Sequence, residues 1–217
     1  MEISWWGHSC FCVREGGAVV VTDPFDDSLG YKLPQVEADI VTVSHQHPHH
    51  DNTVALAGEF KIVDKPGEYE IRSVFITGIA TYSKPQPSDE SLTPVRNVVF
   101  VLDFGDLVVC HLGDLTRVLA QEQIEALGDV DVLLVPIGGG GQTLNASQGA
   151  ELVSRIEPRL VIPMHCCPVA GEDTDGPIDR FLKEMGGREV LPIDVLRVSA
   201  SNLPTETQIA VLNLTSS

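Results

Sequence analysis

The stretch DIVTVSHQHPHHDN, residues 39–52, joins a short apolar run to the densest group of histidines in the chain. Four of the seven histidines fall within six residues, at positions 45, 47, 49 and 50. The β-branched residues predict a buried strand, and residues two apart in a strand point the same way, so His45 and His47 can converge on one ion. Pro48 redirects the chain, and His50 can return from the following turn. Because imidazole binds zinc and its neighbouring transition metals, the stretch predicts a metal site at a strand end.

Polar residues follow two other apolar runs in the same way. His165 comes directly after RLVIPM, residues 159–164, and Asp114 comes two residues after DLVVCHL, residues 106–112. One histidine at a strand end is usually a hydrogen-bonded surface or core residue. For the four clustered histidines a solvated turn or a chance metal-binding tract is the alternative, but together with His165 and Asp114 they favour metal binding. For His111, which lies inside a predicted strand, we expect an ordinary hydrogen-bonded surface or core residue.

The rest of the pattern predicts a layered α/β fold. Apolar, β-branched runs predict short buried strands at residues 18–23, 39–44, 97–104, 106–112, 131–137, 159–164 and 208–214. Helical patterns with suitable cap residues lie at residues 116–128, 145–158 and 176–187. No repeat or linker divides the chain, so we expect one domain over residues 1–217, with an exposed loop at 83–94.

The composition restricts the class of function. Acidic residues outnumber basic ones 31 to 14, and the formal charge of −17 repels phosphate backbones and anionic lipid. We therefore expect a small-molecule substrate and no nucleic acid or membrane partner, while a homo-oligomer stays open. No apolar run reaches the ~18–20 residues of a membrane span, and the start lacks a signal-peptide pattern, so we expect a cytoplasmic protein. The five cysteines form no CxxC pair, and we expect reduced, mostly buried thiols.

Taken together, these motifs resemble the metallo-β-lactamase superfamily, in particular its ascorbate-6-phosphate lactonase-like branch. SHQHPHHD, residues 44–51, is similar to the His-x-His-x-Asp-His signature of that superfamily. Further motifs occur in the order of that branch and at about its spacings: ISWWGHSCF, VVVTDPF, PGEYEI, HLGDL, VLLVPIGGG and VIPMH. The resemblance extends from residue 1 to about residue 168. It implies an α/β fold, a four-layer αββα sandwich, with a metal site along one edge of the two sheets.

The resemblance also implies a ligand set. His45 and His47 match ligands of a first metal ion, and His50 and His165 match ligands of a second. Asp114 matches the carboxylate that bridges both ions, and it would be central to catalysis. The implied cofactor is zinc, as one or two ions, with another divalent transition metal as the alternative.

Two residues near the site and two departures from the family pattern complete the comparison. Asp23 matches an acidic residue that orients an imidazole, and His8 matches a histidine at the site edge that binds substrate or moves a proton. The signature aspartate is His49 here, which adds an imidazole and removes a charge. A further histidine ligand of the first ion is replaced by Ser83. Asp51 is a candidate to supply the missing carboxylate.

These features predict a metal-dependent hydrolase. A metal-bound hydroxide would attack a small ester, lactone or phosphodiester, with His8 or the network of Asp23 handling protons. The alternative is a non-catalytic or single-metal protein of the same fold that binds or senses a ligand. Since His49 and Ser83 alter ligand positions, we expect one tightly bound ion and a second only in excess metal.

Two pairs of neighbouring residues carry smaller expectations. Trp5 and Trp6 alternate faces of a strand, so we expect one in the core and one partly exposed. Cys166 and Cys167 directly follow a proposed ligand, and we expect buried thiols there rather than a thiolate ligand.

Overall fold

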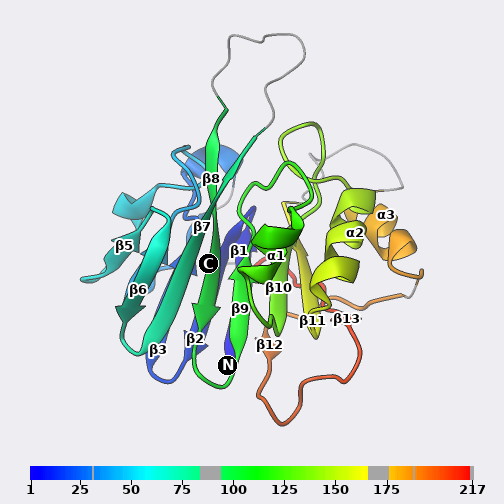
Figure 1. Ribbon diagram of the computed structural model, residues 1–217. Helices are drawn as coiled ribbons and strands as arrows, with labels where there is room; N and C mark the ends of the chain where they lie inside the picture. The colour runs from blue at the N-terminus through cyan, green and yellow to red at the C-terminus, as the bar shows by residue number, and fades with distance from the viewer. Residues whose placement is uncertain (31, 84–93, 166–175, 188, 216–217) are drawn as a thin grey trace.

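The computed structural model describes residues 1–30, 32–83, 94–165, 176–187 and 189–215. Two mixed β-sheets face each other, and the described α-helices lie together on the outer side of the second (Figure 1). The first sheet runs in the order β12 (Leu196–Arg197), β1 (Glu2–Gly7), β2 (Cys10–Glu15), β3 (Ala18–Thr22), β4 (Ile40–Thr42), β5 (Lys61–Val63). The second runs in the order β13 (Gln208–Ile209), β11 (Leu160–Met164), β10 (Val132–Pro136), β9 (Val108–His111), β8 (Arg96–Asp103), β7 (Val74–Tyr82), β6 (Gly67–Ile71).

The central strands of the second sheet, β8 to β11, are buried on both faces. Along β8, Phe100 belongs to the apolar cluster shared with the first sheet, whereas Val99 and Val101 belong to the cluster under the helices. Successive side chains of a strand point to opposite faces, so continuous apolar runs are what such a strand requires. The shared cluster also takes Phe11 from β2 and Leu134 from β10. Burial on both faces explains why the apolar runs of the sequence predicted these strands correctly.

The helices agree with prediction at two of three places. α2 (Ala146–Ile156) begins after Asn145, whose side chain accepts a hydrogen bond from the Gln148 amide at 2.9 Å, and α3 (Pro177–Glu184) begins with proline. α1 is shorter than the predicted helix at 116–128 and spans only Gln121–Glu125.

The reason for the short α1 lies in tertiary contacts. Leu119 is fully buried under the helical layer, and its carbonyl accepts a hydrogen bond from the Arg155 side chain at 2.9 Å. The Leu115 carbonyl accepts from the Leu144 amide at 2.8 Å. These partners replace the bonds that a helix would supply, so the segment stays non-helical until Ala120.

The predicted strand at 208–214 is also too long. Only Gln208 and Ile209 pair with β11, and the chain then turns toward the first sheet, where Leu212 bridges Ile193 and Leu214 bridges Trp5. The apolar run at 208–214 therefore contacts first one sheet and then the other, which the periodicity of the sequence does not reveal.

The outer face of the first sheet is covered by loops. The short 3-10 helices η1 (Asp27–Leu29) and η2 (Thr53–Ala55) lie in these loops, and Phe25 and Leu33 pack against this face. The cover buries Trp6 to 4% exposure, and Trp5 is buried at 8% on the inner side. The expectation that one tryptophan is partly exposed is therefore wrong.

Some expectations fall on residues that the structure does not describe. Residues 84–93 of the predicted loop, and both Cys166 and Cys167, lie outside the described residues. Cys10, Cys12 and Cys110 are buried and unbonded, as expected. Within the described residues, none of the helices has the length and apolar character needed to cross a membrane.

Candidate metal centre

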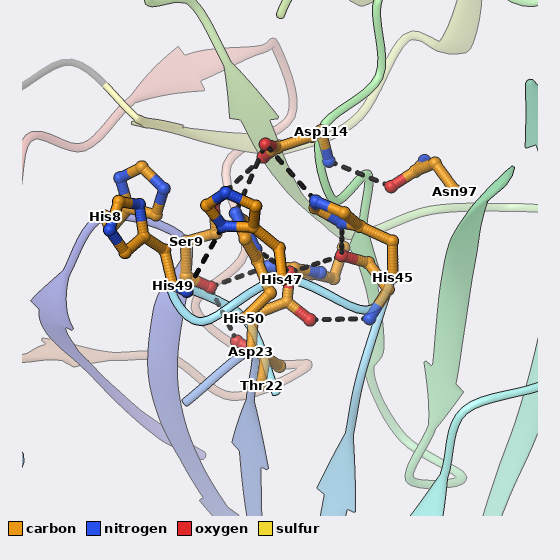
Figure 2. A network of polar contacts seen from close by, with 12 residues as sticks. His8, Ser9, Thr22, Asp23, His45, His47, His49, His50, Asn97 and Asp114 are labelled. Atoms are coloured by element: carbon orange, nitrogen blue, oxygen red, sulfur yellow. Dashed lines mark hydrogen bonds and ion pairs between the residues drawn. The ribbon is translucent and has the colours of Figure 1, made fainter. Parts of the chain in front are cut away.

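Chain segments at the ends of strands from both sheets meet at one edge of the sandwich. His8 follows β1, Asp23 follows β3, Asp114 follows β9 and His165 follows β11. Figure 2 shows the histidines of the loop after β4 grouped between Asp23 on one side and Asp114 on the other. The structure thus brings together side chains that lie up to 157 residues apart, from His8 to His165.

One oxygen of Asp114 lies within 4 Å of three imidazole nitrogens. Asp114 Oδ2 lies 3.2 Å from His50 Nε2, 3.5 Å from His165 Nε2 and 3.9 Å from His45 Nε2. The other oxygen, Oδ1, accepts a hydrogen bond from the Ser9 hydroxyl at 3.4 Å. Burial would raise the pKa of Asp114, but the hydrogen bonds from His165 and His50 and the charges of these rings hold it well below its usual range. Asp114 is therefore an anion in contact with two of the rings expected at the second site and one expected at the first.

Asp23 sets the tautomer of two of these rings. His50 Nδ1 donates to Asp23 Oδ2 at 2.9 Å, so Nε2 faces Asp114. The Ser44 hydroxyl donates its single proton to Asp23 Oδ2 at 2.6 Å, and its oxygen therefore accepts from His45 Nδ1 at 3.0 Å. Both rings thus direct Nε2, the atom that would bind a metal, toward Asp114, and Asp23 orients the one ring directly and the other through Ser44.

Two groups of this network have shifted pKa values. Burial would lower the pKa of His50, but the hydrogen bonds and charges of Asp114 and Asp23 outweigh burial and raise it to about 10. Burial would raise the pKa of Asp23, which nevertheless stays low because of the nearby His111 and His50 rings and the Ser44 hydroxyl. The carboxylates of Asp23 and Asp114 thus favour positive charge on the His50 ring, which lies between them.

His8 lies inside the cluster and not at its edge. Its ring centroid is 3.8 Å from that of His165 and 4.9 Å from that of His50. Its backbone carbonyl accepts from Trp5 Nε1 at 3.0 Å and from the His165 amide at 3.1 Å. Burial, followed by the charges of His165 and His50, lowers the pKa of His8 to about 3, so this ring is neutral at ordinary pH. Together with Asp114 these three rings offer ligand atoms that all lie within 4.8 Å of one another.

The other histidines of the signature lie farther out. His47 is exposed, and its Nδ1 accepts from the His49 amide at 3.2 Å. The His49 ring is turned toward η1, with Nε2 3.0 Å from the Ser28 hydroxyl. Asp51 is exposed and does not line the pocket described below, so the structure does not bring it to the site. Ser83 lies at the pocket wall, where its hydroxyl accepts from the Val95 amide at 2.9 Å.

The cluster forms the floor of a pocket of about 510 Å³. The described residues of its wall are His8, His45, Gln46, His47, His49, His50, Thr81, Tyr82, Ser83, Val95, Asn97, Asp114, Thr116, Gly141, Gln142 and His165. Asp114 is the one carboxylate among these residues, and none of them is lysine or arginine. A ligand would therefore meet amide, hydroxyl and aromatic groups around the imidazoles.

Several supporting residues could not be recognised from the sequence. Asn97 is buried on β8, and its Oδ1 accepts from the Asp114 amide at 2.9 Å while Nδ2 donates to Thr81 and to the Leu112 carbonyl, both at 3.0 Å. Gly113 has φ +56°, and a Cβ there would lie 2.3 Å from Asn97 Oδ1. The only sequence signals for these positions are a polar residue in an apolar strand and a glycine beside a carboxylate.

His111 behaves as expected for a core residue. It is fully buried, and Nε2 lies 2.9 Å from the Ser9 carbonyl, which can only accept, so Nε2 carries the proton. Nδ1 has no hydrogen-bond partner in the described structure. Burial is the main cause that lowers the pKa of His111, and the neutral ring is the folded form.

Comparison with known proteins agrees with this fold and site. Residues 2–165 match the family described as the beta-lactamase superfamily domain. The chain is 28% identical to a UPF0173 protein of Pyrococcus furiosus over 204 residues, which cover 88% of this chain and 93% of the relative. It is 32% identical to a UPF0173 metal-dependent hydrolase of Thermoplasma acidophilum over 192 residues, which cover 76% and 83%.

A solved structure supports the same assignment. A Thermotoga maritima protein, a candidate Zn-dependent hydrolase of the metallo-β-lactamase superfamily, superposes with a TM-score of 0.78. The two chains are 34% identical, and the match covers 97% of each. The chain belongs to the metallo-β-lactamase superfamily, and the expected fold is confirmed. Its relatives include proteins named metal-dependent hydrolases.

Proposed function

We propose that the chain is a metal-dependent hydrolase that acts on a small ester, lactone or phosphodiester. The observation that carries the proposal is the convergence of three imidazole Nε2 atoms, from two distant places in the chain, within 4 Å of Asp114 Oδ2 at a pocket. The names of the relatives support hydrolysis as the class of reaction, and the substrate class is our own step.

The donor set fits a transition metal. Two ligands at ~2.0–2.1 Å from one tetrahedral ion lie about 3.3 Å apart. The separations of 3.2 and 3.5 Å from Asp114 Oδ2 to His50 and His165 are close to this value. The rings of His45 and His50, held through Nδ1, both direct Nε2 toward Asp114. Imidazole nitrogens together with one carboxylate oxygen suit zinc. We therefore propose zinc as the resident ion.

The residues of the site have three different roles: holding the ion, positioning its ligands and orienting the substrate. A bound divalent ion would supply Lewis-acid chemistry, lowering the pKa of water and polarising the bond to be broken. Asp114 and the imidazoles hold the ion, while Asp23 acts as a positioning residue because it touches His50 and Ser44 and not the pocket. Gln46, Gln142 and other neutral polar groups of the wall orient the substrate by hydrogen bonds. A pocket of this size suits a small substrate.

The test combines metal content with turnover. Protein purified without added metal is analysed for bound elements, then assayed with a nitrophenyl ester, a γ-lactone and a bis-nitrophenyl phosphodiester after zinc reconstitution. Asp114→Asn should lose bound metal and at least about 100-fold of any turnover, because it removes the shared anionic ligand.

The control is Asp106→Asn, an exposed carboxylate in the turn before β9, which should leave both quantities unchanged. A zinc-replete wild type that hydrolyses none of the three compounds would overturn the proposal. In that case the alternative, a metal-binding protein without catalysis, replaces it.

A further inference from the structure

We infer that His8, and not the histidine at the signature aspartate position, completes the metal site, so that one ion is held tightly by His8, His50, Asp114 and His165. The inference deepens the proposed function and rests on its metal site. It assigns to His8 the place of a ligand, which neither the family signature nor the names of the relatives gives to it.

The histidine at the signature position is held away from the cluster. The Ser28 hydroxyl donates to the Asp26 carboxylate, so its oxygen accepts from His49 Nε2–H at 3.0 Å. This bond occupies Nε2 of His49, so only its Nδ1 could bind a metal. His49 is also absent from the group whose ligand atoms lie within 4.8 Å of one another. Its nearest ring is that of the exposed His47, at 4.7 Å between centroids.

The backbone around His8 turns its side chain inward. The pairing of β1 with β2 shifts register between Trp5 and Gly7, as in a β-bulge, and such irregularities re-aim side chains. Gly7 has φ +114° and His8 has φ +52°, a conformation that residues other than glycine adopt mainly where the surroundings enforce it. The two hydrogen bonds to the His8 carbonyl, from the Trp5 ring and the His165 amide, supply that enforcement.

The four donors fit one ion with small adjustments. Their ligand atoms lie within 4.8 Å of one another, against about 3.3 Å in a tetrahedral zinc site. Rotations of the imidazoles about their side-chain bonds bridge that difference. Imidazole nitrogens and a carboxylate oxygen are donors that zinc takes, and an ion with five ligands would keep one position for the water of the proposed hydrolysis. Figure 2 shows the His8 ring beside that of His49, on the side of the cluster away from His45.

The remaining histidines make a weaker position. His45 is the farthest of the three rings from Asp114 Oδ2, at 3.9 Å, and His47 is exposed. The Ser83 hydroxyl, at the position of the missing third ligand, already accepts from a backbone amide. A second ion would therefore have fewer strong ligands, and only the His8 position binds tightly.

The experiment compares matched variants, His8→Asn and His49→Asn, by titration of the apo protein with zinc against a chromophoric chelator. Asparagine tolerates the left-handed backbone of His8 better than other non-glycine residues, which protects folding. His8→Asn should weaken the tight site at least about 100-fold, since loss of even an outer partner costs 10–100-fold. His49→Asn should change the affinity by less than about 3-fold. Far-UV circular dichroism of both apo variants verifies that they are folded.

Cobalt(II) spectra give a second readout that does not depend on activity. The visible absorption of cobalt bound to the wild type should be kept by His49→Asn and altered by His8→Asn. If His49→Asn loses the metal and His8→Asn keeps it, the inference is overturned while the proposed hydrolase stands. If the wild type binds no metal, the inference and the proposed function fall together.

Discussion

Replacing Gly113 by alanine tests how the structure fixes Asp114. Gly113 has φ +56°, and an added Cβ would lie 2.3 Å from Asn97 Oδ1 and 2.6 Å from Ser44 Cβ. Both contacts are too short, so Asn97 and Ser44 must each move by about 1 Å, and the movement of Asn97 breaks its 2.9 Å bond from the Asp114 amide. Gly16 is a matched control, because it has the same φ of +56° and nothing within 4 Å of its added Cβ.

The expected magnitudes follow from these terms. Placing alanine in the left-handed region costs about 1–2 kcal/mol at either position. Only Gly113→Ala adds overpacking, about 1–3 kcal/mol, and a lost hydrogen bond to a shielded amide, about 1–3 kcal/mol. We expect urea unfolding of the apo protein to show Gly113→Ala about 2–6 kcal/mol less stable than Gly16→Ala.

Zinc affinity should separate the same two variants. Since Asn97 holds Asp114 and Ser44 orients His45, Gly113→Ala should bind zinc about 10–100-fold more weakly, while Gly16→Ala should bind it as the wild type does. Equal stabilities within about 1 kcal/mol, together with equal affinities, would refute this account of how Asp114 is held.

Three further predictions concern neighbouring residues. Ser83→His should raise the zinc stoichiometry from one to two per chain in excess metal, because it adds an imidazole at the weaker position. The exposed control Ser201→His should leave the stoichiometry unchanged. An unchanged zinc count for Ser83→His by elemental analysis would contradict this prediction. Asp23→Asn should weaken zinc binding about 10–100-fold because it loses an acceptor for His50, and Asp39→Asn, which alters a carboxylate on Arg72, should not. His111 has a lowered pKa when folded, so its contribution to stability is present above its unfolded pKa of ~6.5 and is lost as pH falls below that value. His111→Asn should therefore flatten the fall of the unfolding free energy of apo protein between about pH 6.5 and 5, and an unaltered slope would exclude this role.

The apolar runs miss the partly exposed β6 and β7, and they predict the centre of the second sheet because its strands are buried on both faces. Such strands need continuous apolar runs, and β8, β10 and β11 appear in the sequence as runs of this kind. The first five residues of the predicted helix at 116–128 fail because Arg155, 36 residues away from Leu119, satisfies a carbonyl that a helix would otherwise use. Trp6 is misjudged because its cover comes from a loop, and loops leave no periodic signal.

For the candidate site, the sequence predicts which residues take part but not how their side chains are oriented. Positions next to strand ends are visible in the sequence, so His50, Asp114 and His165 were found from apolar runs that stop at a polar residue. Orientation is not visible. Whether His8 or His49 faces the cluster depends on a register shift in β1 and on the Ser28 hydroxyl, and both appear only in three dimensions.

The exchange of a carboxylate for imidazole also changes the charge at the pocket floor. A divalent ion held by Asp114 and three neutral imidazoles keeps one positive charge uncompensated, whereas a second carboxylate ligand would neutralise it. Among the described wall residues no lysine or arginine contributes positive charge, and the chain as a whole carries −17. At physiological ionic strength charges beyond a screening length of ~8 Å act weakly, so an anionic group of a substrate would respond mainly to the ion. Attraction of such a group thus depends on the metal centre itself, because neither the wall nor the surface supplies it.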